Sequence, residues 1–75
     1  MFLVKNIIGS QVKLARKQLE ITQDELAIRL QLTGWDISRS GVAKIEIGIR
    51  QVTDVEVVKL AKALNVSISW LFGEE

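Results

Sequence analysis

Arg39, Ser40 and Lys44 are hydrogen-bond donors whose spacing places them on one side of a predicted helix. The apolar residues Val42 and Ile45 lie on the opposite side of that helix. An Arg side chain can donate two hydrogen bonds to the edge of a guanine, and a Ser hydroxyl can serve several bases. Lys44 lies one turn further along the same face. These side chains are suited to binding a polar surface by direct hydrogen bonding.

The composition argues against catalysis. The chain has neither His nor Cys, so the usual general base, the commonest metal ligand and a thiolate nucleophile are all missing. The sequence also contains no nucleophile–base pair, carboxylate dyad, Gly-rich phosphate loop or metal-ligand spacing. We therefore predict that the protein is not an enzyme and that it needs no cofactor and no metal.

Five helices are predicted to position the three donors, over residues of about 8–19, 23–31, 38–47, 54–64 and 67–72. Ser or Thr residues suited to cap a helix start precede four of them, namely Thr22, Ser38, Thr53 and Ser67. Gly or Asn residues suited to end a helix follow three of them, namely Gly48, Asn65 and Gly73. The chain has 75 residues and no Pro or low-complexity linker. We predict an all-α fold with a single domain over residues 1–75.

Each helix carries apolar residues at helical spacing, and these are expected to face the core. The predicted inward-facing residues are Val12, Ala15, Leu19, Leu26, Ala27, Leu30, Val42, Ile45, Val57, Leu60, Ala61 and Leu64. Hydrophobic residues make up 48% of the chain, which is high for so small a domain. Either the core is unusually complete, or some apolar surface is kept for a partner chain.

Two short helices joined by a turn, with one helix before and two after, form the architecture of repressor-type DNA-binding domains. The sequence resembles the phage-repressor and Cro-like, or Xre-type, helix-turn-helix transcriptional regulators from about residue 8 to residue 72. The matching segments are Ile8–Gly9, Arg16, Thr22–Ala27, Val42–Glu46, Gly48, Leu60–Ser67 and Trp70–Leu71. The resemblance implies sequence-specific binding of double-stranded DNA by a repressor-like transcriptional regulator, with the third helix in the major groove.

The resemblance also implies a role for individual residues. The residues expected to contact bases are Arg39, Ser40 and Lys44. The residues expected to contact phosphates are Gln23, at the start of the second helix, with Arg50 and Gln51 after the third. The residues expected to form a structural ion pair, which fixes the angle of the third helix, are Arg16 and Glu46.

The segment between the second and third helices departs from the family pattern. It is longer by about five residues, and Gln31 stands where the family places a turn Gly. Two interpretations of Trp35 in this loop stay open: a lid over the contact between the two helices, or a contact with DNA or a partner. Two also stay open for Gly41 in the third helix: a tolerated weak point, or close approach of the backbone to DNA.

Charge around the third helix is sparse for a DNA-binding protein. Ten basic and nine acidic residues give a net charge of +1, although residues 1–53 carry a balance of +3 and residues 54–75 one of −2. Ile47, Ile49 and Val52 occupy the turn where the family often has basic residues. We therefore predict weak nonspecific DNA binding.

A homodimer on a palindromic operator is expected, because one such helix covers only a short half-site. The candidate dimer face is Val55, Val58, Ile68 and Phe72, although these residues could instead complete the core. The alternative function is a protein-interaction module or an antitoxin-type partner that reuses the fold. Met1–Val4 is too short for a signal peptide and no apolar run could span a membrane, so a cytoplasmic location is expected.

Overall fold

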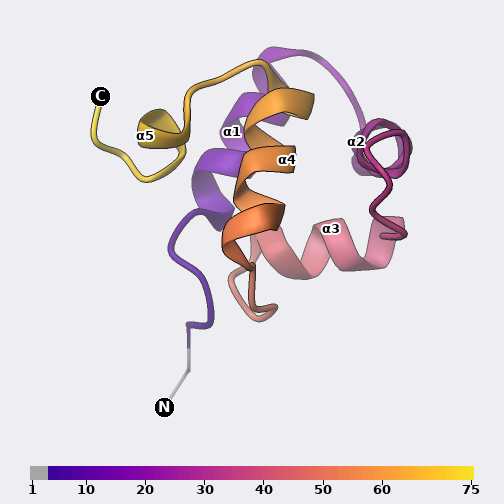
Figure 1. The fold of residues 1–75 in the computed structure, drawn as a ribbon, viewed down its shortest axis with the longest axis horizontal. Helices are drawn as coiled ribbons and strands as arrows, with labels where there is room; N and C mark the ends of the chain where they lie inside the picture. The colour runs from indigo at the N-terminus through magenta and orange to yellow at the C-terminus, as the bar shows by residue number, and fades with distance from the viewer. Residues whose placement is uncertain (1–3) are drawn as a thin grey trace.

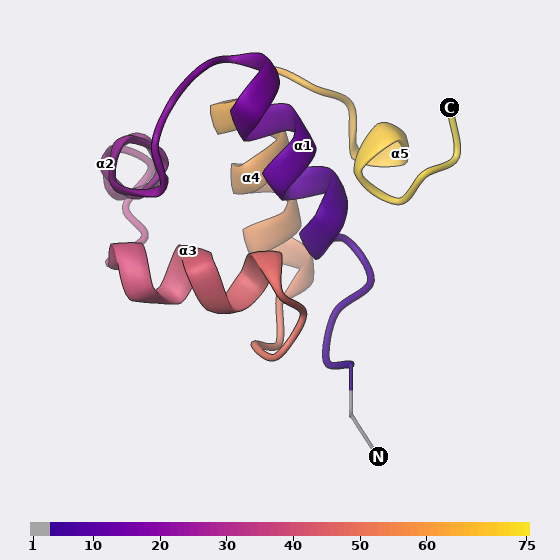
Figure 2. The same cartoon turned by 180° about the vertical axis from the view of Figure 1, so that it is seen from behind.

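The computed structural model describes residues 4–75, which contain five α-helices. The helices are α1 (Gly9–Gln18), α2 (Gln23–Gln31), α3 (Arg39–Glu46), α4 (Asp54–Leu64) and α5 (Ile68–Leu71). In Figure 1 and Figure 2, α1 and α4 lie side by side, α3 runs across one end of them and α2 is seen end-on. The predicted all-α, five-helix fold is confirmed. Most of the apolar Met1–Val4 stretch lies outside the described residues.

Side-chain caps define where the helices begin. Thr22 and Glu25 form a capping box at α2, in which each side chain bonds the backbone N–H of the other residue at 2.9–3.0 Å. Thr53 and Glu56 do the same at α4, while Ser38 and Ser67 cap α3 and α5. The predicted bounds of α1, α3 and α5 are one residue too long at each end, because the flanking residues are caps rather than helix members.

The core lies where α1, α2, α3 and α4 meet. Leu26, Leu30, Ile45 and Leu60 are completely buried there, and Leu71 joins them from α5. Complete burial of a side chain of this size contributes about 1.5–3 kcal/mol. No helix among residues 4–75 is long and apolar enough to cross a membrane.

Leu19 is the exception among the predicted core residues, since it remains 37% exposed. The α1 helix ends at Gln18, so Leu19 is its C-cap, and Glu20 then turns the chain at a positive φ of 58°. Helical spacing therefore no longer applies at Leu19. The buried face of α1 consists of Gly9, Val12, Ala15 and Arg16.

Candidate nucleic-acid interface

The outward face of α3 carries the three predicted donors. Arg39, Ser40 and Lys44 are exposed, whereas Val42 and Ile45 on the other face are buried. Among the described residues, none forms a side-chain hydrogen bond or ion pair with any of these three donors. All three side chains are thus available to an external partner.

Gln23 links the start of α2 to the end of α3. Its side-chain amide donates a hydrogen bond to Glu46 Oε1 at 3.0 Å. A shallow hollow beside it is lined by Arg16, Thr22, Gln23, Asp24 and Arg39. This hollow brings the N-terminus of α2, with its partial positive charge, next to the first residue of α3.

Arg16 and Glu46 form an ion pair that joins α1 to the last residue of α3. Arg16 Nε lies 2.7 Å from Glu46 Oε2 and Nη2 lies 3.1 Å from Oε1, so the pair is bidentate. Arg16 Nη1 also donates to the carbonyl of Ile21 at 2.9 Å. The hydrogen bond to Glu46 raises the pKa of Arg16 despite the opposing effect of burial. Both side chains are at most 10% exposed, and together with Gln23 they hold the C-terminal end of α3 to α1 and α2.

Asn6, which no sequence pattern indicated, uses all of its side-chain bonding capacity at the junction of α1 and α3. Its Oδ1 accepts from the backbone N–H groups of Ile8 and Gly9 at 3.1 and 2.8 Å, which caps the start of α1. Its Nδ2 donates to the carbonyls of Ile45 and Arg50 at 3.1 and 2.8 Å. Asn is a common helix-capping residue, but Asn6 lies two positions before the N-cap Ile8, and its carbonyl partners lie about 40 positions away in the sequence.

Gly9 lets the start of α1 touch the end of α3. A Cβ at this position would lie 2.8 Å from the carbonyl oxygen of Glu46 and closer still to that of Ile45. Both oxygens belong to the backbone, so neither can rotate away. A side chain at residue 9 is therefore incompatible with this approach of the two helices.

The loop between α2 and α3 is held by its own bonds. Gln31 Nε2 donates to the carbonyl of Ile37 at 2.9 Å, and Thr33 Oγ1 donates to that of Leu30 at 2.6 Å. Trp35 is only 8% exposed and packs in the core, which supports the lid interpretation and leaves little of its ring for DNA. A Cβ on Gly41 would lie 2.7 Å from Ile37 Cγ1, so packing of the loop against α3 is a third explanation for that glycine.

Arg50, predicted to contact a phosphate, has partners within the chain. Its guanidinium lies 5.3 Å from the centre of the Trp35 ring and 3.2 Å from Glu56 Oε1, and it bonds the carbonyl of Gln51 at 2.8 Å. Partial burial raises the pKa of Glu56, but hydrogen bonds from Arg50 and Thr53 lower it, and the net result is a lowered pKa. The neighbouring Ile47 is 62% exposed, which leaves an apolar rather than a basic turn.

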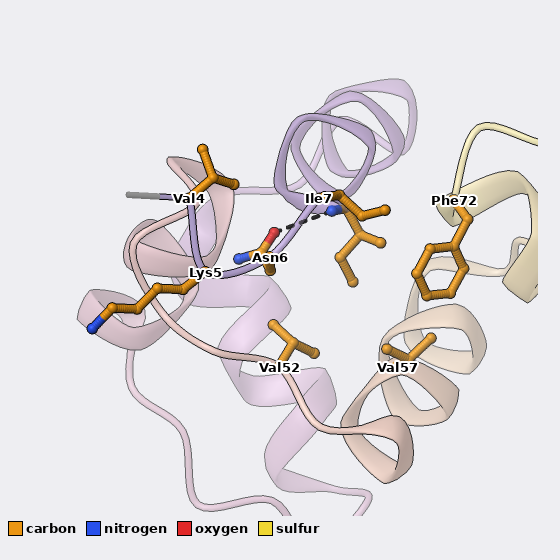
Figure 3. A pocket seen from close by; sticks show the side chains of 8 residues that line it. Val4, Lys5, Asn6, Ile7, Val52, Val57 and Phe72 are labelled. Carbon is orange, nitrogen blue, oxygen red and sulfur yellow. Dashed lines mark hydrogen bonds between the residues drawn. The ribbon is translucent and has the colours of Figure 1, made fainter. Parts of the chain in front are cut away.

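The candidate dimer residues Val55, Val58, Ile68 and Phe72 do not complete the core, since they are all exposed. Two hollows border three of them, Val58, Ile68 and Phe72. One lies between α4 and α5 and is lined in part by Val58 and Ile68. The other is an apolar groove lined in part by Ile7, Val52, Val57 and Phe72, and Figure 3 shows Phe72 and Val57 close together at one end of it.

Comparison with known proteins identifies the family. A family model described as helix-turn-helix matches residues 12–71. No curated protein sequence matches the chain. Among solved structures, the restriction-modification controller protein C.AhdI from Aeromonas hydrophila is similar, with 31% identity, 87% of each chain covered and a TM-score of 0.75.

Two further structures share the fold. The P22 c2 repressor, solved with a synthetic operator, has 21% identity and a TM-score of 0.76 over 93% of this chain and 98% of its own. The clp gene regulator ClgR from C. glutamicum has 20% identity and a TM-score of 0.80 over 99% of this chain and 90% of its own. The chain therefore belongs to the helix-turn-helix family and is of the repressor- and Cro-like, Xre type.

Proposed function

We propose that this chain binds double-stranded DNA sequence-specifically as a repressor-like transcriptional regulator, with α3 as the recognition helix in the major groove. The observation that carries the proposal is the exposed row of donors on α3, which have no side-chain partner among residues 4–75, while the opposite face of the helix is buried. A helix fits the major groove, where each base pair presents a distinct pattern of donors and acceptors. The P22 c2 repressor, which has this fold, was solved on an operator.

The proposed contacts divide into base contacts and phosphate contacts. Arg39, at the start of the recognition helix, is assigned to a guanine edge, and Ser40 and Lys44 to neighbouring bases. One N–H of the Gln23 side-chain amide is bonded to Glu46, so its other N–H and the first-turn backbone N–H groups of α2 would supply the phosphate contact there. Gln51 is exposed and suited to a second phosphate contact.

Replacing Arg39 with Ala is expected to cost about 1–3 kcal/mol on the preferred site, a loss of roughly 5- to 150-fold in affinity, and to relax the sequence preference. The measurement is selection of bound duplexes from a random library at near-physiological salt, followed by titration of the enriched site. Arg29→Ala is the matched control. Arg29 is also an exposed arginine, but it lies on α2 and its guanidinium already bonds the carbonyl of Ala63 in α4. Equal losses on all sequences would assign Arg39 to phosphate instead.

The proposal includes a homodimer formed through Val55, Val58, Ile68 and Phe72. The exposure of these four apolar side chains, together with the hollow between Val58 and Ile68, supports a self-complementary apolar face. Two recognition helices would then meet half-sites about one helical turn, roughly 34 Å, apart on a palindromic operator.

A charge on the proposed dimer face should separate the two copies. We expect Ile68→Glu to sediment as a monomer and to lose the preference for two correctly spaced half-sites, because a carboxylate would be buried without a partner. Ile28→Glu is the control, since Ile28 is an exposed apolar residue on α2. Analytical ultracentrifugation at several concentrations measures the mass. A dimer that survives Ile68→Glu would refute this choice of face.

The exposed Ile47 and Ile49 beside the recognition helix favour a second candidate, a protein-interaction module or antitoxin-type partner. Duplex binding that does not depend on Arg39 or Lys44 would support it. The relation to DNA-binding regulators favours binding over catalysis in either case. Under the principal proposal, the protein acts in the cytoplasm.

A further inference from the structure

We propose that Arg50 is a positioning residue for the recognition helix rather than a phosphate contact. This inference rests on the proposed function and deepens it. The guanidinium of Arg50 lies over the ring of Trp35, 5.3 Å from its centre, and pairs with Glu56 through both carboxylate oxygens, at 3.2 and 3.5 Å. Its side chain is only 32% exposed and that of Glu56 only 20%, so solvent screens this pair less than a fully exposed one.

The three residues come from the segments on either side of α3 and from the helix that follows. Trp35 belongs to the loop that leads into α3, and Arg50 to the segment that leaves it. Glu56 lies in the first turn of α4, where the backbone N–H of Thr53 also bonds its carboxylate at 3.0 Å. The cluster of Trp35, Arg50 and Glu56 thus ties both segments that flank the recognition helix to α4.

The need for such a tie follows from the length of the loop. Seven residues separate α2 from α3, and fixing a longer loop costs more conformational entropy, so contacts beyond the loop's own hydrogen bonds help to hold it in one conformation. At the far end of α3, Glu46 is already held by Arg16 and Gln23. The Trp35–Arg50–Glu56 cluster restrains the end that begins with Arg39, which is the end assigned to base contacts.

Two conservative substitutions separate positioning from phosphate binding. Arg50→Lys keeps the positive charge but loses the guanidinium over the Trp35 ring and its two-pronged pair with Glu56. We expect it to weaken binding to the preferred duplex about tenfold, with an unchanged dependence on salt concentration. Glu56→Gln keeps a carbonyl oxygen for the capping box but loses the charge. If Arg50 positions the recognition helix, Glu56→Gln should weaken binding to the preferred duplex. If Arg50 instead contacts a phosphate, the same substitution should strengthen binding, because it removes a negative charge and releases Arg50.

Asp54→Asn is the matched control, because it removes the same charge from the exposed first turn of α4. Arg29→Lys is the control for the Arg substitution. Tighter binding by Glu56→Gln, or full affinity in Arg50→Lys, would overturn the proposal and restore Arg50 as a phosphate contact.

A measurement without DNA separates this proposal from the proposed function. Amide hydrogen exchange on the free protein should be faster at Ile37, whose N–H bonds the carbonyl of Trp35 at 2.8 Å, in both Arg50→Lys and Glu56→Gln. The amide of Leu64, at the far end of α4, serves as the internal reference. Unchanged exchange at Ile37 would overturn the proposal even if the wild-type protein binds DNA. Faster exchange at Ile37 in both variants, with no specific DNA binding by the wild type, would support the positioning role of Arg50 and refute the proposed function.

Discussion

Gly9→Ala should be among the most destabilising single substitutions in this protein, at about 3 kcal/mol of unfolding free energy. The new Cβ would meet the backbone oxygens of Ile45 and Glu46, so the start of α1 and the end of α3 would have to move apart. Overpacking of this kind costs about 1–3 kcal/mol or more, which exceeds the roughly 1 kcal/mol that Ala gains over Gly within a helix. Thermal and denaturant unfolding followed by circular dichroism measure the effect.

Ser10→Ala is the matched control, since Ser10 is exposed in the next position of α1. We expect it to leave stability unchanged or slightly higher. Gly41→Ala makes a second comparison, because the nearest atom that its Cβ would meet is Cγ1 of the buried Ile37 side chain rather than a backbone atom. We expect it to destabilise the protein less than Gly9→Ala does. Wild-type stability in Gly9→Ala would show that the start of α1 and the end of α3 can move apart without a cost in unfolding free energy.

Breaking the ion pair of Arg16 and Glu46 should lower the free energy of unfolding by an amount similar to that of Gly9→Ala. Removing one partner of a buried ion pair leaves the other without compensation, at a cost of about 3–5 kcal/mol. We therefore expect Arg16→Met and Glu46→Leu each to lower stability and DNA affinity together. Lys17→Met, which removes a neighbouring exposed charge from α1, should do neither.

The double variant Arg16→Met/Glu46→Leu distinguishes stability from orientation. Two apolar side chains of similar volume can replace a buried pair at little cost, so we expect the double variant to recover much of the stability lost by either single variant. Its DNA affinity should stay low, because the bond from Gln23 to Glu46 and the fixed angle of the recognition helix are both gone. Unchanged thermal stability in Arg16→Met would show that the pair has no structural role.

Local sequence signals predicted the helices well, because their starts depend on neighbouring residues. Thr22 with Glu25, and Thr53 with Glu56, needed no knowledge of the fold to be recognised as capping boxes. The prediction that Leu19 faces the core was wrong. The α1 helix ends at Gln18 and the chain turns at Glu20 with a positive φ, so helical spacing does not extend to Leu19.

The candidate site was less predictable, because its supports join distant parts of the chain. Asn6 and Gly9 matter through the carbonyls of Ile45, Glu46 and Arg50, which no local pattern reveals. The pairing of Arg16 with Glu46 came from the family resemblance and not from spacing. The intramolecular partners of Arg50 depend on where the long loop places Trp35, and the sequence alone did not determine that.

The separation of the outward face of α3 from its supports has a consequence for how such a protein can diversify. Within residues 4–75, the side chains of Arg39, Ser40 and Lys44 contribute nothing to the bonds that hold the helix, so substitutions there should change stability by about 0.5 kcal/mol or less. New combinations at these three positions can therefore arise without compensating changes elsewhere. A gene encoding this scaffold could acquire a different target through few mutations, and a library randomised at these positions should consist mostly of folded members.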